Sequence, residues 1–352
     1  MTQVVDWELA AAAAAALGRS GPRVTFDEAA DAVHQLRQLT DVAAGHVAAY
    51  TGLSAQVEHP PVRVVDRRDW AAANVAGLRQ VMGPLLSRLV AEKRPSPVAE
   101  AIGARLSGAQ AGAVLAYLSG RVLGQYEVFA GDPGQLLLVA PNIVDVERRL
   151  GVNPHDFRLW VCLHEVTHRT QFTAVPWLRG HFLDQVGQFV DAAGTDRDEM
   201  AARLRQALAG MADTVRGRRT RVSVVDLVST PAQKVVLDRL TALMTVLEGH
   251  AEHVMDEVGP EVIPSVAAIR ERFDQRRRSG NPLEKALRRL LGVDVKLRQY
   301  AEGRKFVHAV VEEVGMTGFN RVFTEPAALP DLAELADPSR WVARVGRSGP
   351  TA

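Results

Sequence analysis

The chain has 352 residues, enough to bury a substantial core either as one large domain or as two lobes. Its 42 basic and 41 acidic side chains nearly balance, so neither a nucleic acid nor a membrane surface is indicated as a partner. The single cysteine excludes an internal disulfide, and the alanine run at 10–16 follows acidic rather than basic residues, unlike a signal peptide. No segment has the length of an apolar membrane span, and we expect a cytoplasmic protein.

Most of the chain is predicted to be helical. Helical periodicity or runs of helix formers occur at residues 4–17, 26–51, 70–92, 97–123, 154–173, 180–215, 230–258 and 282–291. Strand signals are few, the best at 136–140 and a weaker one at 63–65. The prediction is a mainly α fold with a small β component (α+β). It covers residues 4–344, as a single domain or as lobes 4–175 and 176–344, with a disordered tail at 345–352.

The most informative motif is the sequence His-Glu-Val-Thr-His at residues 164–168, an HExxH signature. On an α-helix His164 and His168 project from the same face, so both rings can bind one zinc ion while Glu165 stands beside the metal-bound water. Gln171 and Trp160 share this stripe. The motif indicates metal-assisted hydrolysis with Glu165 as the general base.

The surrounding sequence predicts the helix that this motif requires. Asn153 is a good N-cap and Pro154 suits the first helical position, whereas Pro176 stops the helix before it. Cys162, two residues before the motif's first histidine, is expected to face away from the metal as a small buried hydrophobe.

A catalytic zinc normally takes three protein ligands, so a third is needed. The strongest candidate is Glu248, at the edge of the apolar arc of helix 230–258. This helix begins with a capping box at Thr230 and is expected to end at Pro260. Glu252, one turn further on, suits an acceptor for the ring N–H of a ligand histidine.

Other assignments remain open at this point. Glu248 and Glu252 also fit a solvated helix face, and His181 and Asp184 lie close enough along the chain to compete for the metal. A fourth protein ligand, for example His250 or Asp184, would indicate a closed structural site instead of a catalytic one.

Gly249, in the middle of the same helix, indicates close approach of another backbone, with the HExxH helix as the candidate neighbour.

The two metal-site segments carry a family resemblance: the HExxH motif with Gln171 and Phe172, and residues 248–256. Further similar stretches are 5–7, 123–126, 139–142, 296–300 with Gly303 and Phe306, and Pro338 with Trp341 and Arg344. The chain resembles the actinobacterial zincin-like metallopeptidase type 2 family, some of whose members are labelled deazaflavin coenzyme biosynthesis-associated. The resemblance covers nearly the whole chain.

A more distant resemblance, to the gluzincin peptidases, bears on individual residues. Their Asn-Glu-Gly-Phe-Ala segment is similar to the sequence that begins at Glu248, which implies that Glu248 binds zinc rather than Glu252. The chain departs from their pattern in having Leu247 for Asn and a longer gap after the HExxH motif. The resemblance also implies that Tyr300 or His253 polarises a substrate carbonyl, although a packing role for Tyr300 is the simpler interpretation.

Two further features have competing interpretations. Segment 136–140 is either the edge strand that in zincins binds an extended peptide or a buried core strand. Arginine clusters at 216–221, 276–278 and 288–289 lack interleaved aromatic residues, which favours solvated surfaces over nucleic-acid binding.

The prediction is therefore a zinc-dependent metallopeptidase or related hydrolase. One Zn²⁺ per chain is bound by His164, His168 and Glu248, and the substrate is a peptide or a small amide or ester. The alternative is a non-catalytic zinc-binding scaffold or partner protein in deazaflavin coenzyme metabolism.

Overall fold

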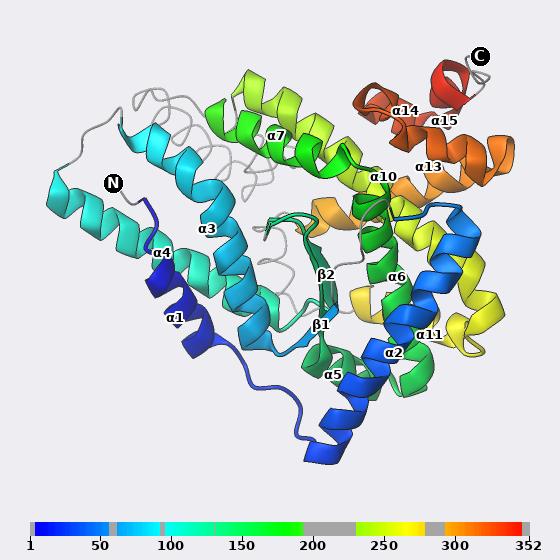
Figure 1. The fold of residues 1–352 in the computed structure, drawn as a ribbon, viewed down its shortest axis with the longest axis horizontal. Coiled ribbons are helices and arrows are strands. Elements are labelled where there is room, and N and C mark those ends of the chain that lie inside the picture. The colour runs from blue at the N-terminus through cyan, green and yellow to red at the C-terminus, as the bar shows by residue number, and fades with distance from the viewer. Residues whose placement is uncertain are drawn as a thin grey trace, which may run out of the picture.

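The computed structural model describes residues 4–55, 62–91, 96–129, 131–192, 230–278 and 293–346. In this part of the chain, helices surround a small sheet, which confirms the predicted fold class (Figure 1). The strands are β1 (Val62–Val65), β2 (Gly124–Glu127) and β3 (Gln135–Val139), in the order β1-β3-β2. β1 runs parallel to β3 and β2 runs antiparallel to it.

The helices and shorter turns follow in chain order. They are α1 (Trp7–Leu17), α2 (Phe26–Thr51), α3 (Arg67–Ala91), α4 (Pro97–Ser119), α5 (Ala140–Leu150), α6 (Pro154–Ala174), α7 (Leu178–Asp191), α10 (Pro231–Val262), α11 (Val266–Arg278), α13 (Val293–Phe319), η1 (Asn320–Phe323), η2 (Pro326–Ala328), α14 (Leu332–Ala336), α15 (Pro338–Trp341) and η3 (Val342–Gly346). No helix in the described ranges is both long and apolar enough to cross a membrane.

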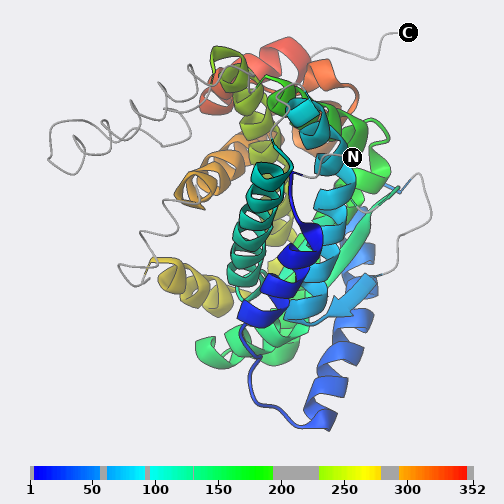
Figure 2. The ribbon, with the colours of Figure 1, turned by 90° about the vertical axis from the view of Figure 1, so that its left-hand side faces the viewer.

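β3 is the central strand and is covered on both faces. Its residues Leu137 and Val139 pack with α1, α3 and α4, the layer that faces the viewer in Figure 2. Leu136 and Leu138 join the core built from α2 and α6. A strand buried on both faces has no polar alternation, which explains its continuous leucine run. The edge-strand interpretation of residues 136–140 is therefore wrong, and β2 lies at the edge instead.

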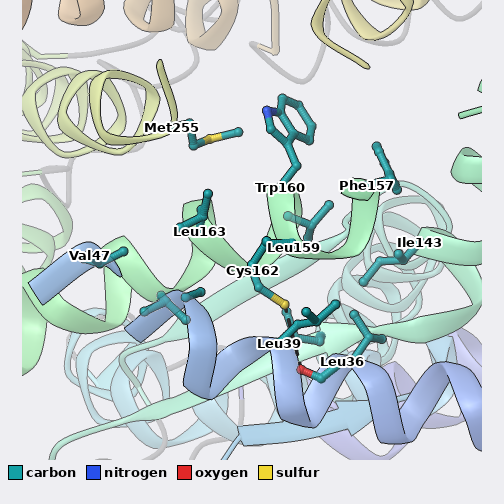
Figure 3. Close-up of a cluster of buried hydrophobic side chains, with 14 of the residues drawn as sticks. Leu36, Leu39, Val47, Ile143, Phe157, Leu159, Trp160, Cys162, Leu163 and Met255 are labelled. Carbon is teal, nitrogen blue, oxygen red and sulfur yellow. Dashed lines mark hydrogen bonds between the residues drawn. The ribbon is translucent and has the colours of Figure 1, made fainter. Parts of the chain in front are cut away.

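The core between α2 and α6 contains Cys162 (Figure 3). Its sulfur lies among Leu36 and Leu39 of α2, whereas Trp160 and Met255 lie on the opposite side of α6. The side chain is fully buried, and burial raises the pKa of the thiol to about 12. The predicted role of a buried hydrophobe that faces away from the metal-binding stripe is confirmed.

Several predicted boundaries differ from the structure. The predicted helix at 97–123 ends at Ser119, and β2 was not predicted. α5, α11 and α13 were also missed; Pro141 falls in the first turn of α5, where proline is well tolerated. α10 continues past Pro260 to Val262. Other predictions fall outside the described residues. These are most of the helix predicted at 180–215, the helix predicted at 282–291, the arginine clusters at 216–221 and 288–289, and the tail from residue 347.

Gly249 does mark a close approach, but to a different neighbour. A Cβ on Gly249 would lie 2.7 Å from the Cα of Gly303 on α13. The HExxH helix, α6, is therefore not the element that requires this glycine. α13 packs along α10 at this crossing and supports the helix that carries Glu248.

Candidate metal centre

α6 places both histidines of the HExxH motif on one face. The helix begins as predicted, with the Asn153 side chain accepting a hydrogen bond from the Asp156 N–H at 3.1 Å. One turn apart within it, His164 and His168 direct their Nε2 atoms to within 3.3 Å of each other. Each ring is largely buried, which holds its orientation.

α10 brings Glu248 to the same point. Its Oε2 atom lies 3.6 Å from Nε2 of His164 and 3.5 Å from Nε2 of His168. α10 begins with a capping box in which the Thr230 side chain accepts from the Gln233 N–H, as the sequence predicted. Glu248 is only 4 % exposed, so its carboxylate is aimed inward and not along a solvated face.

The three donor atoms have the spacing that a zinc ion requires. Tetrahedral zinc with ligands at roughly 2.0–2.2 Å separates them from one another by roughly 3.3–3.6 Å. The observed separations are 3.3, 3.5 and 3.6 Å. The cluster contains no fourth histidine, cysteine or carboxylate among the described residues. Two imidazoles and one carboxylate therefore fit a zinc ion with one position left for water or substrate.

Glu248 also controls the charge of the cluster. Burial disfavours the charged ring of His168, but the hydrogen bond and the negative charge of Glu248 outweigh it, with a smaller contribution from Glu165. The pKa of His168 is raised as a result. The site thus attracts positive charge, either as a proton or as a metal cation.

Glu165 borders the cluster and lies against β2. A Cβ on Gly124 would lie 2.5 Å from Cγ of Glu165, so the strand can approach the carboxylate only because this residue is glycine. The sequence singled out residues 123–126 only as part of the family resemblance. Their position in the lining of the cavity beside Glu165 was missed.

A cavity of about 460 Å³ adjoins the donors and Glu165, a size typical of small-molecule sites. Aromatic residues form much of its wall, with the Trp160 and Phe273 rings edge to face at 4.9 Å and the Phe129 and Phe182 rings at 6.0 Å. The remaining lining residues include Leu123, Gly124, Gln125, Tyr126, Phe172, Met244, Leu247, Glu252 and Met255. The cavity therefore offers apolar contacts beside the polar donor cluster.

Comparison with known proteins places nearly the whole chain in a family. The family model described as zincin-like metallopeptidase matches residues 5–342. The chain belongs to this family. It is also similar to a crystal structure from Chloroflexus aurantiacus, described as that of a candidate hydrolase with a novel fold. The two chains are 32% identical, with a TM-score of 0.70 over 98% of this chain and 100% of that one. A comparison with curated proteins finds no match.

The other predicted site residues of this zincin-like protein lie in different places. Glu252 lines the cavity, with Oε2 3.8 Å from Nη1 of Arg270, and its role as an acceptor for a ligand histidine stays a prediction. Tyr300 falls in α13, but its side chain lies outside the described part of the structure. His181 and Asp184 are on α7, and neither belongs to the donor cluster.

Two further histidines of α10 have other partners. The His250 ring is fully buried and packs against Phe319 and Phe323, and burial lowers its pKa to about 3, so it is neutral. His253 lies with Nε2 2.9 Å from the hydroxyl of Tyr50.

One residue near the metal donors was missed as a partner. The sequence placed Gln171 on the histidine stripe without giving it a role. In the structure its Oε1 lies 2.9 Å from Nδ1 of His168.

Proposed function

We propose that this protein is a zinc-dependent hydrolase that cleaves amide bonds of peptides. The observation that carries the proposal is the 3.3–3.6 Å triangle of His164, His168 and Glu248, which opens onto a cavity shared with Glu165. Membership of the zincin-like metallopeptidase family and similarity to a candidate hydrolase support the same reaction class.

In the proposed hydrolysis, Glu165 transfers a proton from the attacking water to the leaving group. His164, His168 and Glu248 would hold the zinc ion, which would supply Lewis acidity to lower the pKa of a bound water to about 7 and to polarise the scissile carbonyl. Glu165, next to His164 and 6 % exposed, takes the proton from the attacking water. Its carboxyl group then returns the proton to the leaving nitrogen.

β2 supports a peptide as the substrate. It pairs with β3 on one side, and no strand among the described residues pairs with its other side. Gly124, Gln125 and Tyr126 of this strand line the cavity. An extended peptide that hydrogen-bonds to an edge strand gains main-chain affinity, while the aromatic wall accommodates its apolar side chains. A small ester would use less of this surface.

The alternative of a non-catalytic zinc scaffold fits the geometry less well. A structural zinc site is usually closed by a fourth protein ligand. His250 directs Nδ1 to Gln171, and Asp184 is not part of the donor cluster. A connection with deazaflavin coenzyme metabolism rests on the sequence resemblance alone and is kept as a narrower hypothesis about the pathway.

Glu165→Gln tests the hydrolase directly. The variant retains the shape of the side chain, so zinc content and melting temperature should stay near wild type. Turnover of a fluorogenic peptide found by library screening should fall by roughly 10²-fold or more, the usual scale for loss of a general base. Glu261→Gln, an exposed site on α10, is the matched control and should retain turnover. Full activity in Glu165→Gln would disprove the mechanism.

A further inference from the structure

Gln171 is a fully buried amide between the two helices that carry the proposed zinc ligands. It lies on α6, and its Oε1 is 2.9 Å from Nδ1 of His168. Its Nε2 donates to the carbonyl oxygen of Leu247 at 2.9 Å and lies 3.0 Å from Nδ1 of His250, both on α10. The amide therefore connects one zinc-binding ring to the neighbouring helix.

The Leu247 carbonyl decides which way the amide points. A carbonyl oxygen can only accept, so the Gln171 NH₂ must face it, and the amide oxygen must face His168. A flipped amide would place two acceptors against each other. Nδ1 of His168 must then carry the hydrogen. This leaves the lone pair of Nε2 directed at the other two atoms of the donor cluster, where the zinc ion would bind.

His250 fixes the second amide hydrogen. Its Nδ1 accepts from Gln171, so the hydrogen of the neutral ring is on Nε2. That nitrogen is buried and has no hydrogen-bond partner among the described residues, and the His250 ring packs against two aromatic rings, with its centroid 5.2 Å from that of Phe319 and 5.6 Å from that of Phe323. The surrounding aromatic side chains therefore hold His250 as a rigid acceptor.

The two contacts on α10 lie on either side of a zinc ligand. Leu247 precedes Glu248 directly, and His250 follows it by two residues. A shift of this turn relative to α6 would stretch the bonds from Gln171 and also change the distance between Glu248 and His168.

We propose that Gln171 is a positioning residue with two effects. It holds His168 in the tautomer that presents Nε2 to the zinc ion, and it sets the separation of the ligands on α6 and α10, with His250 as its anchor. The inference rests on the proposed zinc site and adds a residue that determines its affinity and geometry.

Two variants test this role in the full-length protein. Gln171→Leu has a similar volume but removes all three contacts. His250→Phe removes only the anchor and suits the aromatic surroundings, so it keeps the test decisive if Gln171→Leu fails to fold. The control is Thr173→Val on the same helix, since Thr173 is buried and its hydroxyl donates within α6, to the Arg169 carbonyl at 2.9 Å.

The readouts are zinc affinity, by competition with a chromogenic chelator, and the visible absorption of protein loaded with Co²⁺. Gln171→Leu should weaken zinc binding by about 10- to 100-fold and alter the Co²⁺ spectrum. His250→Phe should weaken it less, with a smaller spectral change, and Thr173→Val should match wild type.

Wild-type affinity and spectrum in Gln171→Leu would overturn the inference while leaving the zinc site intact. An equal loss in Thr173→Val would also overturn it, because the effect would then belong to α6 in general. Wild-type protein that binds neither metal would instead disprove the proposed function itself.

Discussion

Gly124 leaves the space that the Glu165 side chain occupies. A Cβ there would lie 2.5 Å from Cγ and 2.6 Å from Cδ of Glu165. Because these neighbours are side-chain atoms, Gly124→Ala should displace the carboxylate rather than the backbone. A misplacement of about 1 Å typically costs about 10²-fold in rate, so we expect turnover to fall on that scale while zinc content and melting temperature stay near wild type.

The control for this substitution is Gly120→Ala, a nearby position where an added Cβ has nothing within 4 Å. Steady-state kinetics of the two variants should differ clearly. Similar activity in both would show that Glu165 tolerates a shift and that β2 does not position it.

Two single residues, Glu248 and Glu252, are the candidates for the third zinc ligand. Glu248 has an oxygen within 3.6 Å of both histidine Nε2 atoms, whereas Glu252 is not part of this donor cluster and has an oxygen 3.8 Å from Arg270. Glu248→Ala should therefore weaken zinc binding far more than Glu252→Ala, for which a loss of about 10- to 100-fold is the upper expectation for an indirect partner. Chelator competition measures both, and a larger loss at Glu252 would reverse the assignment.

At the level of helices and strands, the sequence predicted best those helices whose ends are set by neighbouring residues in the chain. α2, with its capping box and C-terminal glycine, agrees with the prediction at both ends, and α6 agrees to within a residue. β2 was missed because it depends on pairing with β3, which no local pattern of residues reveals. Pro260 did not stop the helix at once, since α10 continues two residues beyond it to Val262.

The same distinction applies to the candidate site. His164, Glu165 and His168 were predictable because helical periodicity alone brings them together. Glu248 was found through family resemblance and its place at the edge of an apolar arc. The contacts of Gln171 and the fit of Gly124 were not predictable, since both arise from how separate elements pack against each other.

The crossing of α10 and α13 depends on two glycines. An added Cβ at Gly249 would lie 2.7 Å from the Cα of Gly303 and closer still to its carbonyl group, and one at Gly303 would lie 3.1 Å from the Cα of Gly249 and closer still to the Thr245 carbonyl oxygen. Backbone atoms cannot move aside easily, so Gly249→Ala or Gly303→Ala should lower the free energy of unfolding by about 1–3 kcal/mol or more. Urea denaturation of the zinc-free protein measures this change.

Gly45→Ala on α2 is the matched control, because its Cβ would have nothing within 4 Å. Alanine is a better helix former than glycine, so this variant should be stabilised by about 0.5–1 kcal/mol. Equal effects at positions 45 and 249 would show that the crossing is not tightly packed.

At the scale of the whole molecule, α10 packs against elements of both of the lobes that the sequence analysis offered as an alternative to a single domain, residues 4–175 and 176–344. Val254 and Met255 of α10 belong to the core with α2, α6 and β3, whereas Leu243 and Leu247 belong to the core with α13. The proposed zinc ion would add a further connection between α6 and α10. We therefore expect one cooperative unit rather than two independent lobes.

Calorimetry with and without zinc tests this expectation. A metal that binds only the folded state stabilises it by about 2.7 kcal/mol at a free concentration of 100 times the dissociation constant. Wild-type protein should unfold in a single transition, which zinc moves up by a few degrees, on the order expected for a large domain. In His164→Ala the same addition should leave the transition unchanged, because tight binding requires both histidines. Two transitions, of which zinc shifts only one, would show that the lobes fold separately and that the ion does not join them.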